Sequence, residues 1–342
     1  MEKRKEDIKR LWQLCFHDSE AFMELYFRRC YREGNTLSTE AGGHTIAAMQ
    51  LLDYPMTFCG REMVSRYLSG LCTHPDAQGQ GVMSRLIGQA LRLMREQETT
   101  IATLIPAEPW LFDYYARFGF STVFGKQEEW WESSAAFCKN EGTFSVTRCE
   151  ETAERERVGL YIYKVESRLA CCLLHTPEHW ATLCEDLRIS GGELYALHQN
   201  GRIYGAAVLY PEMESGWRVE ECLADNDCLR TALLNVVCRE KGISRLRVQR
   251  PASLQEPATL PFGMARIIHL PHLLQHYASL HPDSRFTLHI TDPLLPENSG
   301  HYHLANGQCH RLPDSTAPST DISRLTRQLF LPQQPHMTMM MN

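Results

Sequence analysis

The chain has 342 residues, enough for two or three domains, and its 43% hydrophobic and 22% charged residues are typical of a globular protein. The 35 lysines and arginines are outnumbered by 41 aspartates and glutamates, and the resulting net charge of −6 argues against a nucleic-acid partner. No stretch of about 18 apolar residues predicts a membrane span, and the 13 cysteines include no Cys-x-x-Cys pair of a zinc ribbon. We therefore expect a cytoplasmic protein in a reducing compartment, with no membrane partner.

The first part of the chain is predicted to begin with helices and to continue with strands. Apolar residues recur at helical spacing over residues 5–32, with Ser19 as the N-cap of a second helix. Apolar residues 86–94 predict one face of a further helix. The predicted strands cover residues 36–39, 44–54, 63–73 and 100–106.

A glycine-rich loop joins the long third strand to the helix that follows, with Gly79 and Gly81 directly before the first helical turn. The first N–H groups of a helix have no partner within it, the helix dipole is positive there, and glycine lets an anion approach the backbone closely. This arrangement fits a pyrophosphate. No Gly-Lys-Ser/Thr follows, and Ser84 stands where the dinucleotide fingerprint has its third glycine, so the loop belongs to neither of those classes. A glycine-rich turn without a ligand is the alternative.

The loop resembles motif A of the GCN5-related N-acetyltransferases (GNAT), in which a strand is followed by Gln/Arg-x-x-Gly-x-Gly/Ala and a helix. Gln78 and Gly81 match this motif, and Met83 replaces its final glycine or alanine. The resemblance implies acetyl-CoA as co-substrate, with its pantetheine paired with the backbone of the strand end and its pyrophosphate within the loop. The residues expected to bind acetyl-CoA are Leu71, Cys72, Thr73, Gln78, Gly79, Gln80, Gly81, Val82, Met83, Ser84 and Ala107.

The segment after the fourth strand resembles motif B of the same superfamily, because Tyr115 begins a Tyr-x-Arg-Phe-Gly sequence that ends at Gly119. The resemblance implies that Tyr115 faces the thioester sulfur, where a tyrosine hydroxyl protonates the leaving CoA thiolate. Tyr114 is the neighbour most easily confused with it. The alternative interpretation is that both tyrosines are core aromatic residues.

Residues 126–255 repeat the order of hairpin, strand and helix. The dipeptide Asn200-Gly201 predicts a hairpin over residues 191–210, and a strand and a helix are predicted within residues 217–240. In place of the glycine-rich loop stands an acidic segment, residues 224–227, whose carboxylates would repel a pyrophosphate. We therefore expect a second acetyltransferase-like domain that lacks a cofactor site.

The last part of the chain resembles the sterol-carrier-like domain of the Eis (enhanced intracellular survival) acetyltransferases. The residues that carry this resemblance are Thr291-Asp292-Pro293 and Asn298-x-Gly300-x-Tyr302. Strands are predicted at residues 264–269, 286–292 and 300–304, and helices at residues 271–280 and 320–330. The resemblance implies an α/β fold with mixed sheets, in which two tandem GNAT-like domains, residues 1–125 and 126–255, precede a smaller sterol-carrier-like α+β domain, residues 256–342.

The general base of the Eis family is the terminal carboxylate of the chain, which folds back into the first domain; carried over here, it belongs to Asn342. The strand at residues 63–73 contains no Asp or Glu, so the strand carboxylate that many acetyltransferases use is missing. A terminal carboxylate has a low pKa and needs desolvation to act as a base. Glu108 and Asp113 are the alternative bases, and a frayed terminus is the alternative interpretation of the methionine-rich tail.

These features predict an acetyl-CoA-dependent N-acetyltransferase that acts on a primary amine of the aminoglycoside, polyamine or lysine type. The alternative is a non-catalytic CoA sensor or a lipid-binding module that uses the third domain. The family resemblance also implies a homo-oligomer. No metal site is expected, because His269, His272 and His276 have no cysteine or carboxylate at ligand spacing.

Overall fold

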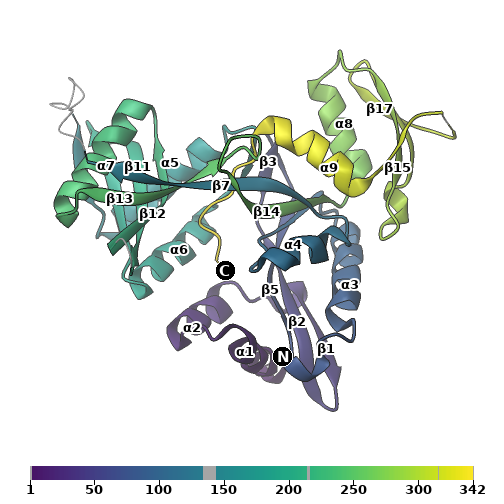
Figure 1. Cartoon of the computed structure of the whole chain (residues 1–342), viewed down its shortest axis with the longest axis horizontal. Helices are drawn as coiled ribbons and strands as arrows, with labels where there is room; N and C mark the ends of the chain where they lie inside the picture. The colour runs from purple at the N-terminus through teal and green to yellow at the C-terminus, as the bar shows by residue number, and fades with distance from the viewer. Residues whose placement is uncertain (1, 134–143, 214–215, 315, 342) are drawn as a thin grey trace.

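The computed structural model describes residues 2–133, 144–213, 216–314 and 316–341. The chain forms three lobes, joined across the middle by one long twisted sheet (Figure 1). The strand order of this sheet is β1-β2-β5-β6-β14-β7-β13-β12-β11-β10-β8, with parallel and antiparallel pairs. The predicted mixed α/β class is confirmed.

The first lobe packs helices on both faces of the strands that come early in the chain. Helix α1 contributes Trp12 to the core on one face, and α3 contributes Leu86 and Leu91 to the core on the other. Ser19 caps α2 as predicted, since its hydroxyl accepts a hydrogen bond from the Phe22 N–H. The elements are α1 (Glu2–Phe16), α2 (Glu20–Arg29), β1 (Thr36–Ala41), β2 (His44–Asp53), β3 (Met56–Phe58), β4 (Arg61–Met63), β5 (Ser65–Thr73), α3 (Val82–Glu96), β6 (Ile101–Leu104) and α4 (Pro109–Ala116).

The prediction of one strand from residue 63 to residue 73 was wrong at its start. Residues 61–63 form the separate strand β4, which pairs with β3, and β3 pairs in turn with β9 from the second lobe. Strand β5 begins at Ser65. The short hairpin was not predicted because its three-residue strands are too short to show an alternating pattern.

The second lobe contains the hairpin β10–β11 and the helix α7, which were predicted, and the helices α5 and α6, whose bounds were not. Asn226 caps α7 by accepting a hydrogen bond from the Leu229 N–H, so the acidic segment is a helix cap. The elements are β7 (Ser121–Glu132), β8 (Ser145–Arg148), α5 (Thr152–Glu166), β9 (Cys171–Leu173), α6 (Pro177–Ile189), β10 (Glu193–Gln199), β11 (Arg202–Glu212), β12 (Gly216–Ala224), α7 (Asp227–Lys241) and β13 (Arg245–Ala252).

The third lobe has a four-stranded sheet in the order β17-β16-β15-β18. Strand β14 lies instead in the large sheet, between β6 and β7, and the expected boundary between residues 125 and 126 falls within β7. From α9 the tail returns to the middle of the molecule, where the C-terminus is marked in Figure 1. The elements are β14 (Leu260–Ile267), α8 (Leu270–Leu280), β15 (Phe286–Thr291), β16 (Gly300–Ala305), β17 (Gln308–Leu312), β18 (Ser319–Asp321) and α9 (Ile322–Phe330).

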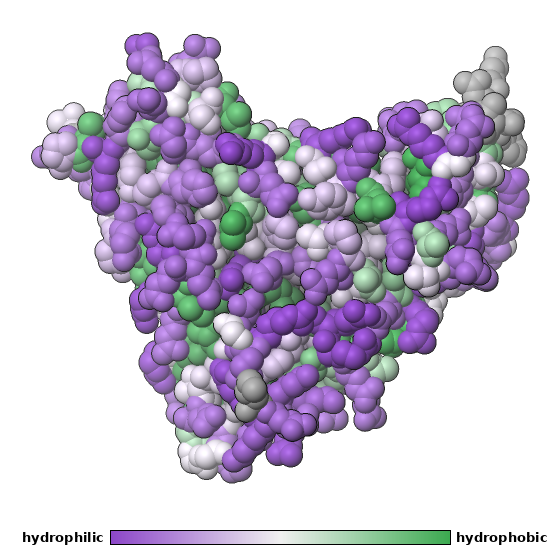
Figure 2. Space-filling view, turned by 180° about the vertical axis from the view of Figure 1, so that it is seen from behind, coloured by the Kyte–Doolittle hydropathy of each residue, from purple (hydrophilic) through white to green (hydrophobic). Residues whose placement is uncertain are grey.

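Hydrophilic residues predominate on the face of the molecule that is turned away in Figure 1, and apolar residues lie among them in small groups (Figure 2). Within the described ranges, none of the helices has both the length and the apolar character that crossing a membrane requires.

Candidate active site

The parallel strands β5 and β6 separate partway along β5. They pair from Ser65 to Tyr67, and β6 ends at Leu104 whereas β5 continues to Thr73. Residues 68–73 pair with β2 on one side, and no strand in the described part of the chain pairs with them on the other. Backbone N–H and C=O groups on that open side can therefore pair with an extended ligand, as in β-strand addition.

A β-bulge lies in this open part of β5. Residues Gly70 and Leu71 stand opposite a single residue of β2, Met49. Gly70 has a φ of +60°, and a Cβ at this position would lie 2.0 Å from the Trp12 ring of α1. Because a bulge locally redirects the backbone, the Leu71 peptide leaves the regular ladder at the point where the two strands separate.

The glycine-rich loop follows directly after β5 and is exposed. Gly79 and Gly81 have φ angles of +73° and +72°, and Gly81 is the N-cap of α3. A Cβ added to Gly79 would meet no atom within 4 Å. The Gln78 side chain donates to the carbonyl of Thr73 at the end of β5, at 3.3 Å, and the Gln80 side chain donates to the carbonyl of Asp76, at 2.8 Å. Open space beside two left-handed glycines at a helix N-terminus fits a phosphate group.

The other predicted cofactor residues have different surroundings. Val82 is buried in the core, whereas Met83 and Ser84 are half-buried in the first turn of α3. Cys72 is buried and Thr73 is half-buried at the end of β5. Ala107 lies in the exposed connection between β6 and α4. The strand end, the loop and the first turn of α3 therefore follow one another along the chain, whereas Ala107 comes from a separate segment.

Tyr115 lies on α4 and is 6% exposed, with its ring centroid 6.3 Å from that of Phe120. Burial raises the pKa of the Tyr115 phenol, and the neighbouring Tyr114 raises it by a smaller amount. The pKa of Tyr67 is raised by burial and then by Tyr115, which places the two phenols near each other. Tyr67 is the last β5 residue paired with β6, so Tyr115 lies close to the point of separation.

Tyr114 has a different environment from Tyr115. Its hydroxyl lies 3.2 Å from that of Ser84 on α3, and the guanidinium of Arg117 lies over its ring at 4.7 Å. Tyr114 therefore faces the first turn of α3, while Tyr115 faces the core.

The end of α4 is enclosed by residues of the C-terminal third of the chain. Gly119 has a φ of +81°, and a Cβ there would lie 2.0 Å from Nη1 of Arg266 on β14. The fully buried Arg266 donates hydrogen bonds from Nη2 to both carboxylate oxygens of Asp292, at 2.8 and 3.0 Å. Asn298 also donates to Asp292, at 2.9 Å. The two segments that carry the sequence resemblances in the first and third lobes thus meet at this buried ion pair.

The tail reaches the interior of the molecule, as a base at its terminus would require. Asn342 itself lies outside the described residues. The alternative bases, Glu108 and Asp113, are both exposed. The buried methionines of the tail are Met337, Met339 and Met341, which are 2%, 3% and 4% exposed.

A cavity of about 350 Å³ surrounds the last described residues of the tail. Asp186 and Glu220 contribute carboxylates to its wall, and burial raises the pKa of both. Asp186 accepts a hydrogen bond of 2.7 Å from the Tyr210 hydroxyl. The full lining is Phe22, Leu183, Asp186, Ser190, Tyr210, Arg218, Glu220, Met339, Met340 and Met341. Arg218 in the same wall pairs with Glu220 at 3.1 Å, so a second cation that entered this cavity would mainly offset the desolvation of Asp186.

Several residues of this site were not predicted from the sequence. Trp12, Arg266 and Glu221 each contact a segment far away in the chain, and local periodicity carries no signal for such contacts. The adjacent carboxylates of residues 220 and 221 are the sequence feature that sets β12 apart.

Two segments of the chain match known domain families. Residues 1–123 match an acetyltransferase (GNAT) domain and residues 270–335 match a sterol carrier protein domain. No curated protein matches the sequence.

Solved structures share the fold over nearly the whole chain. Eis1 from Mycobacterium abscessus is 12% identical, with a TM-score of 0.77 over 96% of this chain and 88% of that chain. A GCN5-related N-acetyltransferase from Anabaena variabilis is 16% identical, with a TM-score of 0.76 over 98% and 90%. One from Kribbella flavida is 17% identical, with a TM-score of 0.72 over 96% and 86%.

Proposed function

Because residues 1–123 match a GNAT acetyltransferase domain, residues 270–335 match a sterol carrier protein domain and the chain shares the fold of Eis1, we propose that it transfers the acetyl group of acetyl-CoA to a primary amine. The observation that carries this proposal is the open side of β5, which leads into a left-handed glycine loop and the N-terminus of α3 beside the buried Tyr115. This arrangement offers backbone donors to the pantetheine and to the pyrophosphate of one extended ligand.

The roles of the cofactor residues follow from their chemistry. The backbone of residues 71–73 would pair with the pantetheine amides, and the N–H groups of residues 78–84 would bind the pyrophosphate. The loop has no lysine or arginine between Gln78 and Ser84, but Arg85, the next residue, donates a hydrogen bond to the Gln80 carbonyl at 3.1 Å. The backbone N–H groups, the helix dipole and this guanidinium would together attract the phosphates. Ala107 would contact the same ligand from the connection between β6 and α4.

In the proposed reaction, the amine nitrogen attacks the thioester carbonyl carbon and forms a C–N bond. The carbonyl oxygen becomes an oxyanion, which accepts a hydrogen bond from a backbone N–H near the bulge at Leu71. The C–S bond then breaks, and Tyr115 donates its proton to the departing sulfur. The raised pKa of Tyr115 supports this role, because the phenol keeps its proton at neutral pH.

The acceptor amine has to lose a proton, and we propose that the terminal carboxylate of Asn342 accepts it. The burial of the tail supports this assignment, because desolvation raises the basicity of a carboxylate. The exposed Glu108 and Asp113 lack this advantage. The cavity beside the tail contains two carboxylates, Asp186 and Glu220, and one guanidinium, Arg218, and this acidic excess favours a cationic acceptor of the aminoglycoside, polyamine or lysine type.

The test is acetyl transfer from acetyl-CoA to a panel of aminoglycosides, polyamines and lysine peptides, with products detected by mass spectrometry. Thiol-reactive dyes are unsuitable, because the chain has 13 cysteines. A product heavier than the amine by one acetyl group is the expected result. Binding of acetyl-CoA without transfer to any amine would overturn the proposal in favour of a non-catalytic CoA sensor.

A further inference from the structure

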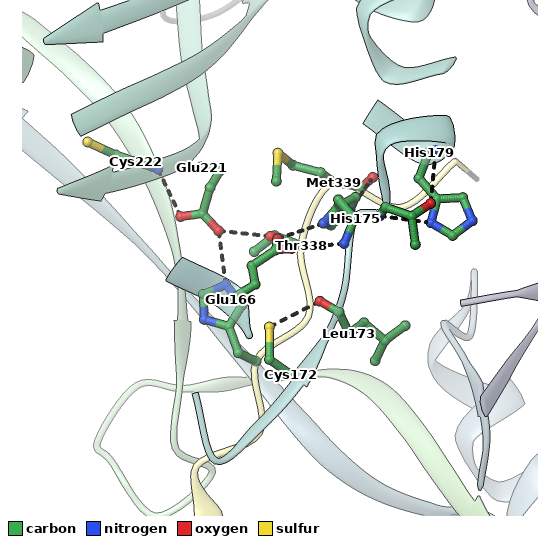
Figure 3. A network of polar contacts seen from close by, with 11 residues as sticks. Glu166, Cys172, Leu173, His175, His179, Glu221, Cys222, Thr338 and Met339 are labelled. Atoms are coloured by element: carbon green, nitrogen blue, oxygen red, sulfur yellow. Dashed lines mark hydrogen bonds and ion pairs between the residues drawn. The ribbon is translucent and has the colours of Figure 1, made fainter. Parts of the chain in front are cut away.

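The tail is held by the second lobe just before it reaches the cavity. His336 forms a short parallel β-bridge with β9: its N–H donates to the Cys171 carbonyl at 2.8 Å, and its carbonyl accepts from the Leu173 N–H at 3.1 Å. Two buried side-chain networks of the same lobe contact three residues of the tail, His336, Thr338 and Met339 (Figure 3).

The first network is centred on Glu221 of β12, which is 3% exposed. Its Oε2 accepts hydrogen bonds from Oγ1 of Thr338 at 2.8 Å and from Nε2 of His336 at 3.0 Å. Its Oε1 accepts from the Cys222 N–H at 2.9 Å. Glu221 follows a β-bulge at Glu220, the extra residue of β12 opposite β11. A buried carboxylate with this many donors binds the two tail residues strongly.

The second network joins Glu166 and His175 to the tail (Figure 3). Glu166 is fully buried; its Oε2 accepts from the His175 N–H at 2.8 Å, and its Oε1 lies 2.7 Å from Nδ1 of His175. Nε2 of His175 lies 3.3 Å from the Met339 carbonyl oxygen. A carbonyl oxygen only accepts, so Nε2–H is the donor, and with ionised Glu166 both ring nitrogens donate.

The tail changes direction at the residue that the second network holds. Met339 has a φ of +51°, a left-handed conformation that a side chain with a Cβ rarely adopts. After this turn, Met340 and Met341 line the cavity that contains Asp186 and Glu220. A costly backbone conformation persists only where surrounding contacts fix it, and here the bond from His175 does so.

We propose that Glu221 and His175 are positioning residues: they fix residues 336–339 so that the end of the chain enters the acidic cavity and its carboxylate meets the acceptor amine. This inference rests on the proposed function. In this account the second lobe, which lacks the glycine loop, positions the base for the site on the first lobe.

The test measures tail release and catalysis in the same variants, Thr338→Val and Glu221→Gln. Each variant removes part of the Glu221 network and leaves the cofactor loop and Tyr115 intact. We expect carboxypeptidase to remove the terminal residues at least tenfold faster than from the wild type. We expect kcat to fall by roughly 100-fold, the scale of a misplaced catalytic group, while the Kd for acetyl-CoA measured by calorimetry changes less than twofold.

Two control variants separate positioning from general stability. Thr338→Ser keeps the hydroxyl and should retain the wild-type kcat. Glu128→Gln removes a half-buried carboxylate that pairs with Lys126 on β7 and with Arg247 on β13. This variant should leave both tail release and kcat unchanged. If Glu221→Gln does not fold, Thr338→Val still decides, because it removes one hydroxyl from the tail itself.

The outcomes distinguish this inference from the proposed function. A wild-type protein that acetylates no amine contradicts the proposed function, and carboxypeptidase release then reports on the tail contacts alone. A wild-type protein that is active, with kcat in Thr338→Val within twofold of it, overturns the inference, whether or not the tail is released. Equal release rates in the wild type and the variants overturn it as well.

Discussion

Tyr115 is buried, and burial raises the pKa of its phenol, so the phenol keeps its proton at neutral pH. Replacing it by phenylalanine removes one hydroxyl and keeps the packing against Phe120, so folding should be little affected. Because a general acid contributes roughly 100-fold or more to a rate, we expect Tyr115→Phe to lower kcat by that factor and to leave acetyl-CoA binding intact. Steady-state kinetics and calorimetry measure the two quantities.

Tyr114→Phe is the matched control for this substitution. Tyr114 contacts Ser84 and Arg117, so its loss should raise the KM for acetyl-CoA without a comparable loss of kcat. A larger fall of kcat in Tyr114→Phe than in Tyr115→Phe would reverse the two assignments.

The tail contacts should depend on pH in both directions. Burial raises the pKa of Glu221, but the contacts with His336, Thr338 and the Cys222 N–H together outweigh it, and the net shift is downward from 4.5. The stability that Glu221 contributes is therefore present above 4.5 and is lost as the pH falls through the lowered value. Burial lowers the pKa of His175, but Glu166 outweighs it, and the net shift is upward from 6.5. The stability that His175 contributes is therefore full below 6.5 and is lost as the pH rises through the raised value.

Urea unfolding of the wild type and of Glu221→Gln from pH 3 to pH 7 tests the predicted loss of stability at low pH. The groups that face the two networks are Glu166, Glu221, His175, His179 and His336. At pH 7 we expect Glu221→Gln to lower the free energy of unfolding by about 2–3 kcal/mol, the range for a buried charged hydrogen bond. The difference should shrink as the pH falls below the Glu221 pKa. A constant difference from pH 3 to pH 7 would contradict the assignment.

At the scale of elements, the junction between β5 and α3 requires glycine for two separate reasons. Gly81→Ala places a Cβ in a left-handed conformation, at a cost of about 1 kcal/mol, and also brings it beside the N–H groups that would bind phosphate. Gly42→Ala, in the exposed turn between β1 and β2, has the same backbone cost, since its φ is +59°. We expect similar losses of stability in the two variants. Only Gly81→Ala should bind acetyl-CoA more weakly, by roughly tenfold, because this factor corresponds to the loss of one charged hydrogen bond. Equal affinities in the two variants would exclude the loop as the phosphate site.

The junction between α4 and β7 depends on the third lobe. Gly119→Ala would combine a left-handed conformation with a contact of 2.0 Å to the buried guanidinium of Arg266. We expect a loss of about 3 kcal/mol or more in the free energy of unfolding, measured in urea. Gly60→Ala is the control: its φ is +73° and no atom lies within 4 Å, so it should cost about 1 kcal/mol. Equal costs would show that Arg266 moves aside freely.

The elements that the sequence predicted best are those with a strong local pattern. The α3 helix, the β10–β11 hairpin and the cap at Ser19 depend on residues close in the chain. The insertion of β14 between β6 and β7, and the ion pair of Arg266 with Asp292, depend on which distant segments pack together. Spacing within the sequence contains no information on such partners, so the glycine loop was predicted and the residues that hold the tail were not.

At the scale of the whole molecule, the acidic cavity is built from all parts of the chain. Phe22 comes from the first lobe, Asp186 and Glu220 come from the second, and the methionines come from the tail that follows the third. Arg32, in the connection between α2 and β1, pairs with Glu178 of α6 at 2.8 Å and joins the first two lobes. If the acceptor binds in this cavity, as proposed, its site requires the first two lobes and the tail together, whereas the glycine loop and the open side of β5 belong to the first lobe alone.

The central claim is that the end of the chain takes part in the reaction, and one comparison tests it most directly. The protein with its native C-terminus and a version extended by a few residues after Asn342 are assayed side by side for acetyl transfer to the best amine of the panel. We expect kcat to fall by roughly 100-fold in the extended protein, because the terminal carboxylate is replaced by a peptide bond, while acetyl-CoA binding is unchanged. Equal kcat in the two proteins would contradict the claim and point to Glu108 or Asp113 as the base.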